Sequence, residues 1–255
     1  MTEKTLNNRK NGMVVLLLLV LAYVASVVLF IFGVSYDILP LTLISCVWFV
    51  FGWIFFLGLK VLKPQEALVL TLFGKYVGTL KNSGFYFVNP FCTAVNPAAG
   101  TKLNQSGDVK VLGAKQPSGG VDISIDIPTK KISLKIMTLN NNRQKINDCL
   151  GNPVEIGIAV MWRVVDTAKA VFNVDNYKEY LSLQCDSALR NIVRIYPYDI
   201  APNVDTTGDG IADEGSLRGS SEVVAARIKD EIQDKVSEAG IEILEARITY
   251  LAYAP

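Results

Sequence analysis

The chain has 255 residues, 50% of them hydrophobic, and its 25 lysines and arginines nearly balance 24 acidic residues, for a net charge of +1. This near-neutral charge argues against nucleic-acid binding, which normally requires a marked basic excess. The sequence contains no histidine, which excludes Ser-His-Asp and Cys-His catalysis and every histidine-containing metal site.

Two long uncharged segments dominate the N-terminal part of the chain. They cover residues 13–34 and 38–59, after a polar tail over residues 1–12. Each has roughly 22 residues and, as a helix rising about 1.5 Å per residue, is long enough to cross the hydrocarbon core of a bilayer. Neither has the polar face expected of a soluble core helix. We predict a transmembrane helical hairpin over residues 13–59.

Charged residues flank this hairpin unevenly. The turn between the two segments carries only Asp37, whereas basic residues precede the first segment and follow the second, namely Lys4, Arg9, Lys10, Lys60 and Lys63. Because basic residues favour the cytoplasmic side of a membrane, we expect both termini to be cytoplasmic and Tyr36 to face outward. The expected location is the cell membrane, with two spans and a cytoplasmic C-terminal domain.

The hydrophobic pattern beyond the hairpin is that of a mixed α/β domain. Short apolar runs and alternating patterns predict strands over residues 66–73, 85–88, 109–112, 121–127, 131–137 and 154–165, with a final strand over residues 241–250. The alternation is clearest over residues 154–165, where Trp162 lies on the apolar face. We therefore expect Trp162 to be buried in the core.

Two helices are predicted between these strands. Asp166 can cap a short helix that includes residues 169–172, and Asp175 or Asn176 can cap a longer helix that runs to Tyr196, where a proline stops it. The longer helix has apolar residues at three- and four-residue spacing, which predicts a buried stripe of Tyr177, Leu181, Cys185, Ala188, Ile192 and Ile195.

A third helix begins at Ser220 or Ser221. Its predicted buried stripe is Ala225, Ile228, Ile232, Val236 and Ala239, and Gly240 is suited to the C-cap. Its opposite face is densely charged, with Glu231 and Lys235 at a supporting i, i+4 spacing. We predict that this face contributes to contacts between subunits of a homo-oligomer, through Asp230, Glu231, Asp234 and Lys235. A solvated face without a partner is the alternative.

The residues carry no recognisable catalytic or cofactor motif. There is no GxxxxGK[ST] phosphate loop and no GxGxxG motif, so we expect no cofactor and no enzymatic activity. One loop places carboxylates at positions suited to calcium, namely Asp205, Asp209 and Asp213. Because Ser216 stands where a bidentate glutamate is required, a polar insertion between two helices is the favoured interpretation and no metal is expected.

Three stretches, in order, resemble a known family. They are KPQEALVLTLFGKYVGTLKNSGFYFVNPF (residues 63–91), GNPVEIGIAVMWRVVDTAKAVFNVDNY (residues 151–177) and SLRGSSEVVAARIKDEIQDKVSEAGIEILEARITYLAYAP (residues 216–255). The first contains a short strand, a Gly-aromatic-aromatic turn and the sequence NPF. With the hairpin before them, these stretches resemble the stomatin/prohibitin/flotillin (SPFH, band 7) domain family.

The resemblance implies an α/β (α+β) domain of two lobes, a β-rich one over residues 63–140 and one of strands and helices over residues 141–255. It implies a non-enzymatic scaffold that forms rings or cages with copies of itself on the lipid bilayer. Such a scaffold organises membrane microdomains and recruits or restrains a membrane protease, channel or transporter. The alternatives are an accessory subunit of one membrane enzyme or transporter without a cage and, more remotely, a Ser–Lys membrane hydrolase. The family's long C-terminal helix is absent from this chain, so we expect the natural chain to continue beyond Pro255.

Overall fold

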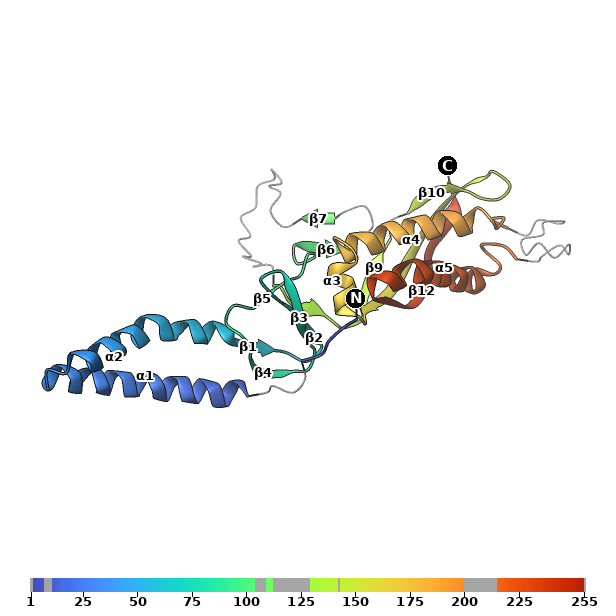
Figure 1. Cartoon of the computed structure of the whole chain (residues 1–255). Helices are drawn as coiled ribbons and strands as arrows, with labels where there is room; N and C mark the ends of the chain where they lie inside the picture. The colour runs from blue at the N-terminus through green and yellow to red at the C-terminus, as the bar shows by residue number, and fades with distance from the viewer. Residues whose placement is uncertain are drawn as a thin grey trace, which may run out of the picture. The chain divides into compact units, whose positions relative to one another are not determined.

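The computed structural model describes residues 2–6, 11–103, 109–111, 129–141, 143–199 and 215–254. The chain divides into two compact units, whose elements are labelled in Figure 1. The hairpin unit comprises Glu3–Val95 with Lys130–Ile132, and the C-terminal unit comprises mainly Asn96–Thr129 and Ser133–Pro255.

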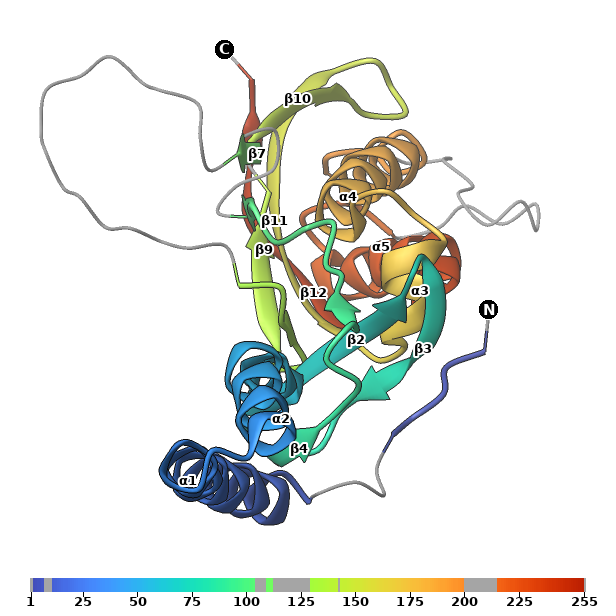
Figure 2. The same ribbon diagram turned by 60° about the vertical axis from the view of Figure 1, so that its left-hand side comes forward.

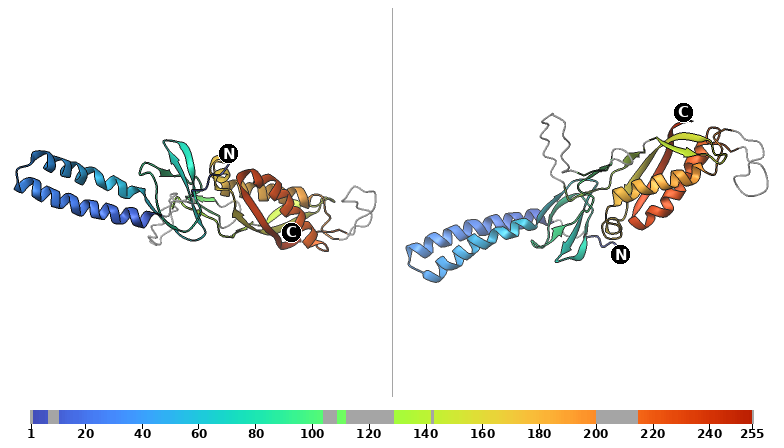
Figure 3. Two further views of the ribbon diagram at one scale, coloured as in Figure 1. Left: turned by 60° about the horizontal axis from the view of Figure 1, so that its bottom comes forward. Right: turned by 90° about the horizontal axis from the view of Figure 1, so that it is seen from above.

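The hairpin unit begins with two helices that are long and apolar enough to cross a membrane. They are α1 (Gly12–Ser35) and α2 (Leu39–Phe51), and the 3-10 helix η1 (Gly52–Gly58) continues α2. The two helices lie side by side (Figure 3), as predicted, although the 3-10 geometry at the end of the second was not foreseen. Of the 18 most apolar consecutive residues of the first helix, only 11% are buried. The corresponding share in the second helix, which comprises α2 and η1, is 17%. These are exposed apolar surfaces, unlike those of a soluble core helix.

Aromatic and small residues pack the two helices together. The ring centroid of Tyr23 in α1 lies 5.9 Å from that of Phe49 and 5.7 Å from that of Phe56. A Cβ atom on Gly33 would lie 3.0 Å from the backbone nitrogen of Thr42, so glycine permits the close approach. These close contacts hold the two helices together as one element.

Short antiparallel strands complete the hairpin unit. β1 (Leu59–Leu62) pairs with β4 (Gly84–Phe87), while β2 (Glu66–Leu72) pairs with β3 (Lys75–Leu80) and β5 (Thr93–Ala94). β8 (Ile132–Ser133) also pairs with β2. The buried side chains between these strands include Leu62, Leu68, Leu70, Leu80 and Tyr86. β2 and β4 confirm the predicted strands within about a residue, whereas β1 and β3 were not predicted.

The end of the hairpin is joined directly to β4. The backbone N–H of Val88 donates to the carbonyl oxygen of Gly58 at 2.9 Å. A Cβ atom on Gly58 would collide with the carbonyl oxygen of Val88, so only glycine fits at this position. The second apolar helix therefore ends against the β-structure of its own unit, without a linker.

The C-terminal unit is built on a four-stranded antiparallel sheet. Its central strand is β11 (Pro153–Val164), with β12 (Ile241–Tyr253) on one side and β9 (Met137–Asn140) and β10 (Gln144–Asn147) on the other. β6 (Thr101–Leu103) and β7 (Val109–Val111) form a separate pair. Helices cover one face of the large sheet (Figure 2).

Three α-helices make up this cover, and each begins where the sequence predicted. α3 (Thr167–Phe172) is capped by the Asp166 carboxylate, α4 (Tyr177–Val193) by the Asn176 side chain, and α5 (Ser221–Val236) begins after Ser220 without a side-chain cap. The short 3-10 helix η2 (Ser237–Ala239) follows α5 and ends at Gly240, which has a φ of 66°. A position with a left-handed backbone at a helix end favours glycine, and the sequence predicted Gly240 at this C-cap.

The predicted core of this unit is confirmed. The alternating side chains of β11 are all buried, namely Val154, Ile156, Ile158, Val160, Trp162 and Val164. The stripe of α5 is buried throughout. Trp162 is 1% exposed, and its ring meets the Tyr177 ring edge-on at 6.3 Å between centroids.

Three predictions about elements were wrong or lie outside the described residues. The strand expected over residues 131–137 is two separate strands, β8 and β9, because the chain turns between them. α4 ends at Val193 rather than Tyr196, so Ile195 leaves the helical stripe and is 40% exposed. The strand expected over residues 121–127 lies outside the described residues.

Candidate functional site

The predicted contact face of α5 contains two kinds of side chain. Asp230 and Asp234 are exposed and lie one helical turn apart. Glu231 and Lys235 are half-buried and form the predicted ion pair, with 2.8 Å between Oε1 and Nζ. The four side chains therefore lie together, and of the three carboxylates among them only that of Glu231 forms an ion pair with a described residue.

Glu231 and Lys235 also connect α5 to α4. Asn191 Nδ2 donates to Glu231 Oε1 at 3.3 Å, and the Tyr180 hydroxyl donates to the backbone oxygen of Lys235 at 3.0 Å. The hydrogen bond from Lys235, followed by that from Asn191, lowers the pKa of Glu231 below its ordinary value. Glu231 and Lys235 thus stabilise the packing of α5 on α4, whereas Asp230 and Asp234 remain exposed on the same face.

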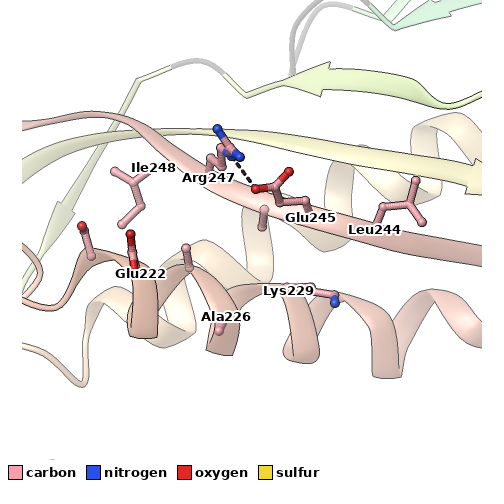
Figure 4. Close-up of a pocket in the computed structure, with 10 residues that line it drawn as sticks. Glu222, Ala226, Lys229, Leu244, Glu245, Arg247 and Ile248 are labelled. Atoms are coloured by element: carbon pink, nitrogen blue, oxygen red, sulfur yellow. Dashed lines mark hydrogen bonds and ion pairs between the residues drawn. The ribbon is translucent and has the colours of Figure 1, made fainter.

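A groove lies beside this face, between the N-terminal half of α5 and the middle of β12 (Figure 4). Its volume is about 550 Å³, within the usual range for ligand-binding pockets. Ala225, Ala226 and Ala246 line it with small side chains, and β12 adds the half-buried Leu244 and Ile248. Because alanine fills little space, the helix and the strand leave a hollow between them.

Charged side chains also line the groove. Glu245 and Arg247 on β12 form an ion pair with each other, drawn as the dashed line in Figure 4. Glu222 and Lys229 on α5 have no ion-pair partner among the described residues. They are seven residues apart, or about 10 Å along the helix. The groove therefore has an acidic side chain near one end and a basic one near the other.

β12 is also an edge strand, and its backbone is only partly covered. In the part of the chain that the structure describes, β12 pairs with β11 alone. At its start, the Gln233 side chain donates to the oxygen of Ile241 at 3.2 Å and accepts from the nitrogen of Ile243 at 2.7 Å. This amide takes the place of a neighbouring strand. Beyond Ile243, no described element pairs with the outward side of the strand.

The hairpin unit carries a second notable surface, which is aromatic. Phe73, in the turn between β2 and β3, is 89% exposed, and its ring stacks on that of Phe91 at 6.4 Å between centroids. Phe91 also lines an apolar cleft of about 590 Å³ together with Phe51 and Phe55 from the second apolar helix. The exposed aromatic pair is thus continuous with the apolar surface of the hairpin.

Two ionisable groups of the C-terminal unit, the buried Cys185 and the half-buried Lys178, have pKa values shifted by their surroundings. Burial and then the Asp186 carboxylate raise the pKa of the Cys185 thiol, which keeps it protonated and unreactive. Burial lowers the pKa of Lys178, whose Nζ donates to the backbone oxygens of Thr101 at 2.6 Å and Ala98 at 3.2 Å. This lysine is therefore held by two backbone carbonyl groups.

The remaining candidate site is not described. Asp205, Asp209 and Asp213, the weak calcium candidates, lie outside the described residues. Among the residues that are described, no cluster of three or more acidic or cysteine side chains is arranged to hold a metal ion. The charged face, the groove beside it and the apolar hairpin are thus the features from which a function can be argued.

Comparison with known proteins adds one finding. The profile of the SPFH domain / Band 7 family matches residues 60–255, which is more than half of the chain. No curated protein matches the sequence. The match begins two residues after η1 ends at Gly58, so it covers the chain from the end of the apolar helices onward.

Proposed function

The chain belongs to the SPFH domain / Band 7 family, and we propose that it is a non-enzymatic membrane scaffold that assembles with copies of itself. In this role it organises a patch of membrane and recruits or restrains other membrane proteins, such as a protease, channel or transporter. The observation that carries the proposal is the placement of the family domain, residues 60–255, directly after two helices able to cross a membrane.

Membrane attachment is supported by the packing of the hairpin unit. The hydrogen bond between Val88 and Gly58 fixes the β-structure at the end of the second helix, which limits its distance from the bilayer. Exposed apolar patches mark surfaces that contact membranes or other proteins, which suits the exposed pair of Phe73 and Phe91. We propose that both termini lie in the cytoplasm, because basic residues flank both ends of the hairpin while the turn carries only Asp37.

Self-assembly is supported by the charged face of α5. Asp230 and Asp234 are exposed, and Glu231 and Lys235 form a pair beside them. One exposed ion pair contributes only about 0–1 kcal/mol, but a closed ring repeats every such contact in each subunit. A modest charged contact can therefore decide whether the ring forms.

Affinity purification of the full chain from native membrane, followed by measurement of the mass of the complex, tests this function. A scaffold should be recovered as a large homo-oligomer. Recovery of a small complex with one different protein at simple stoichiometry would instead identify an accessory subunit and contradict the proposal.

A further inference from the structure

We propose that β12 accepts an extended segment of a client protein as an additional antiparallel strand, which lies in the groove between β12 and α5. The client segment carries an apolar residue, with a basic residue on its N-terminal side and an acidic residue on its C-terminal side. The inference rests on the proposed scaffold function, since it identifies the surface by which such a scaffold would hold a client.

The backbone of β12 supplies the first reason. An edge strand presents unpaired N–H and C=O groups, to which an extended peptide adds readily. Among the described residues, Gln233 covers these groups, and it does so only at Ile241 and Ile243. The pairing with β11 shifts register after Ile243 and again after Ile248, and residues 245–248 pair regularly between the two shifts. The same four residues line the groove, so the regular open edge and the hollow coincide.

The side chains of the groove supply the second reason. Alternate side chains of an added strand point to the same face of the sheet, so every second residue of the client would face α5. The alanines of the groove leave space for an apolar side chain there, between the half-buried Leu244 and Ile248. This apolar contact would add specificity to backbone hydrogen bonding.

The charges set the direction of the client. α5 and β12 run in opposite directions, so Glu222 lies near Ile248, and Lys229 lies toward Leu244 (Figure 4). The pairings within this sheet are antiparallel, and antiparallel pairing is slightly the more stable kind. An antiparallel client passes Glu222 first and Lys229 later, so its basic residue precedes its acidic one.

The distance between the charges sets their spacing in the client. Glu222 and Lys229 are about 10 Å apart along the helix. Residues i and i+4 of a strand lie on one face, about 13 Å apart, with residue i+2 between them. Long charged side chains can make up the difference. The favoured pattern is therefore Lys-x-apolar-x-Glu.

A second copy of β12 does not fit this pattern. On β12 the acidic Glu245 precedes the basic Arg247, which is the reverse of the favoured order, and these two residues already pair with each other. An antiparallel β12 from another subunit would therefore present the wrong order of charge to α5.

Two synthetic peptides of equal composition test the proposal on the full chain in lipid nanodiscs. STKTVTETS has the favoured order and STETVTKTS the reverse. The first should bind at least about tenfold more tightly, equivalent to about 1.4 kcal/mol. The double variant Glu222→Lys with Lys229→Glu should invert this preference. Equal binding of the two peptides, or an unchanged preference in the double variant, would overturn the proposal.

A pair of variants on the same helix tests the position of the peptide. Ala226→Trp fills the groove and should abolish binding, whereas Val223→Trp adds the same side chain at an exposed position outside the groove and should leave binding intact. Circular dichroism establishes that both variants are folded. Binding that survives Ala226→Trp, or that is lost equally in both variants, would overturn the proposal.

N-methylation of the peptide tests strand addition itself. Two methylated peptides are compared, one with methyl groups on the backbone nitrogens of the odd-numbered residues and one with them on those of the even-numbered residues. In an added strand only one of these two sets of N–H groups faces β12, so one peptide should lose binding and the other should keep it. Equal effects of the two methylated peptides would overturn the proposal.

The mass of the protein in the same samples tests the scaffold function separately. A large homo-oligomer that binds neither peptide would refute this inference alone. A monomer that binds the peptide would refute the scaffold function alone.

Discussion

Replacement of Trp162 by alanine should strongly destabilise the C-terminal unit. Trp162 has the largest of the fully buried side chains among the described residues, and it packs edge-on against Tyr177. Removing a buried tryptophan costs about 3–5 kcal/mol, of which an aromatic pair accounts for about 0.5–1.5 kcal/mol. We expect Trp162→Ala to lower the free energy of unfolding by about that total.

Trp162→Phe is the matched control. Within the described residues, the indole Nε1 of Trp162 is buried without a hydrogen-bond partner. Phenylalanine keeps an aromatic ring against Tyr177 and removes this unpaired N–H, so no hydrogen bond is lost. We expect a cost below about 2 kcal/mol, clearly less than that of the alanine variant.

Pulse proteolysis in urea measures both variants in the detergent-solubilised full chain, because the protease cleaves the C-terminal unit only when it is unfolded. With an m-value of about 2 kcal/mol per molar, Trp162→Ala should lower the urea midpoint by about 2 M. A loss below about 1 kcal/mol, or equal losses in the two variants, would refute the assigned role of the buried indole.

Three further predictions concern topology, pH and a backbone position. An impermeant thiol reagent applied to intact cells should label Tyr36→Cys but not Lys63→Cys, and the reverse result would mean an inverted hairpin. The pKa of Glu231 is lowered in the folded chain, so the stability that its charge contributes is present above pH 4.5, its ordinary pKa, and is lost as the pH falls through the lowered pKa. Acid should therefore lower the urea midpoint less in Glu231→Gln than in the parent chain. Equal losses in the two proteins would refute this linkage. Gly240→Ala should lower the free energy of unfolding by at least about 2 kcal/mol in the same proteolysis assay. The left-handed backbone costs an alanine about 1–2 kcal/mol, and the new Cβ atom would collide with the carbonyl oxygen of Asp166. An unchanged free energy of unfolding would contradict that geometry.

Elements with strong hydrophobic periodicity were predictable from the sequence. β11 alternates over its whole length, and α5 repeats apolar residues at helical spacing, so the burial of both followed from pattern alone. The caps Asp166 and Asn176 were predictable because their side-chain oxygens suit the backbone at a helix start.

The elements that were missed depend on their partners in the fold. β10 (Gln144–Asn147) contains one apolar residue, Ile146, and is a strand because β11 pairs with it. β3 contains Gly78, which weakens its strand pattern. The groove was missed because its small residues come from α5 and β12, and the sequence does not show that they face each other. The neighbouring alanines at 225 and 226 were the only local sign.

The native mass of the detergent-solubilised full chain tests the central claim, self-assembly through the charged face of α5, most directly. The parent chain should give a large homo-oligomer, and reversal of Asp230, Glu231 and Asp234 to lysine should give folded monomers. Reversal of only Asp230 and Asp234 is the control that keeps the contact between Glu231 and Asn191, and it should also dissociate the assembly. A parent chain that is monomeric, or a triple variant that remains a large oligomer, would contradict the account.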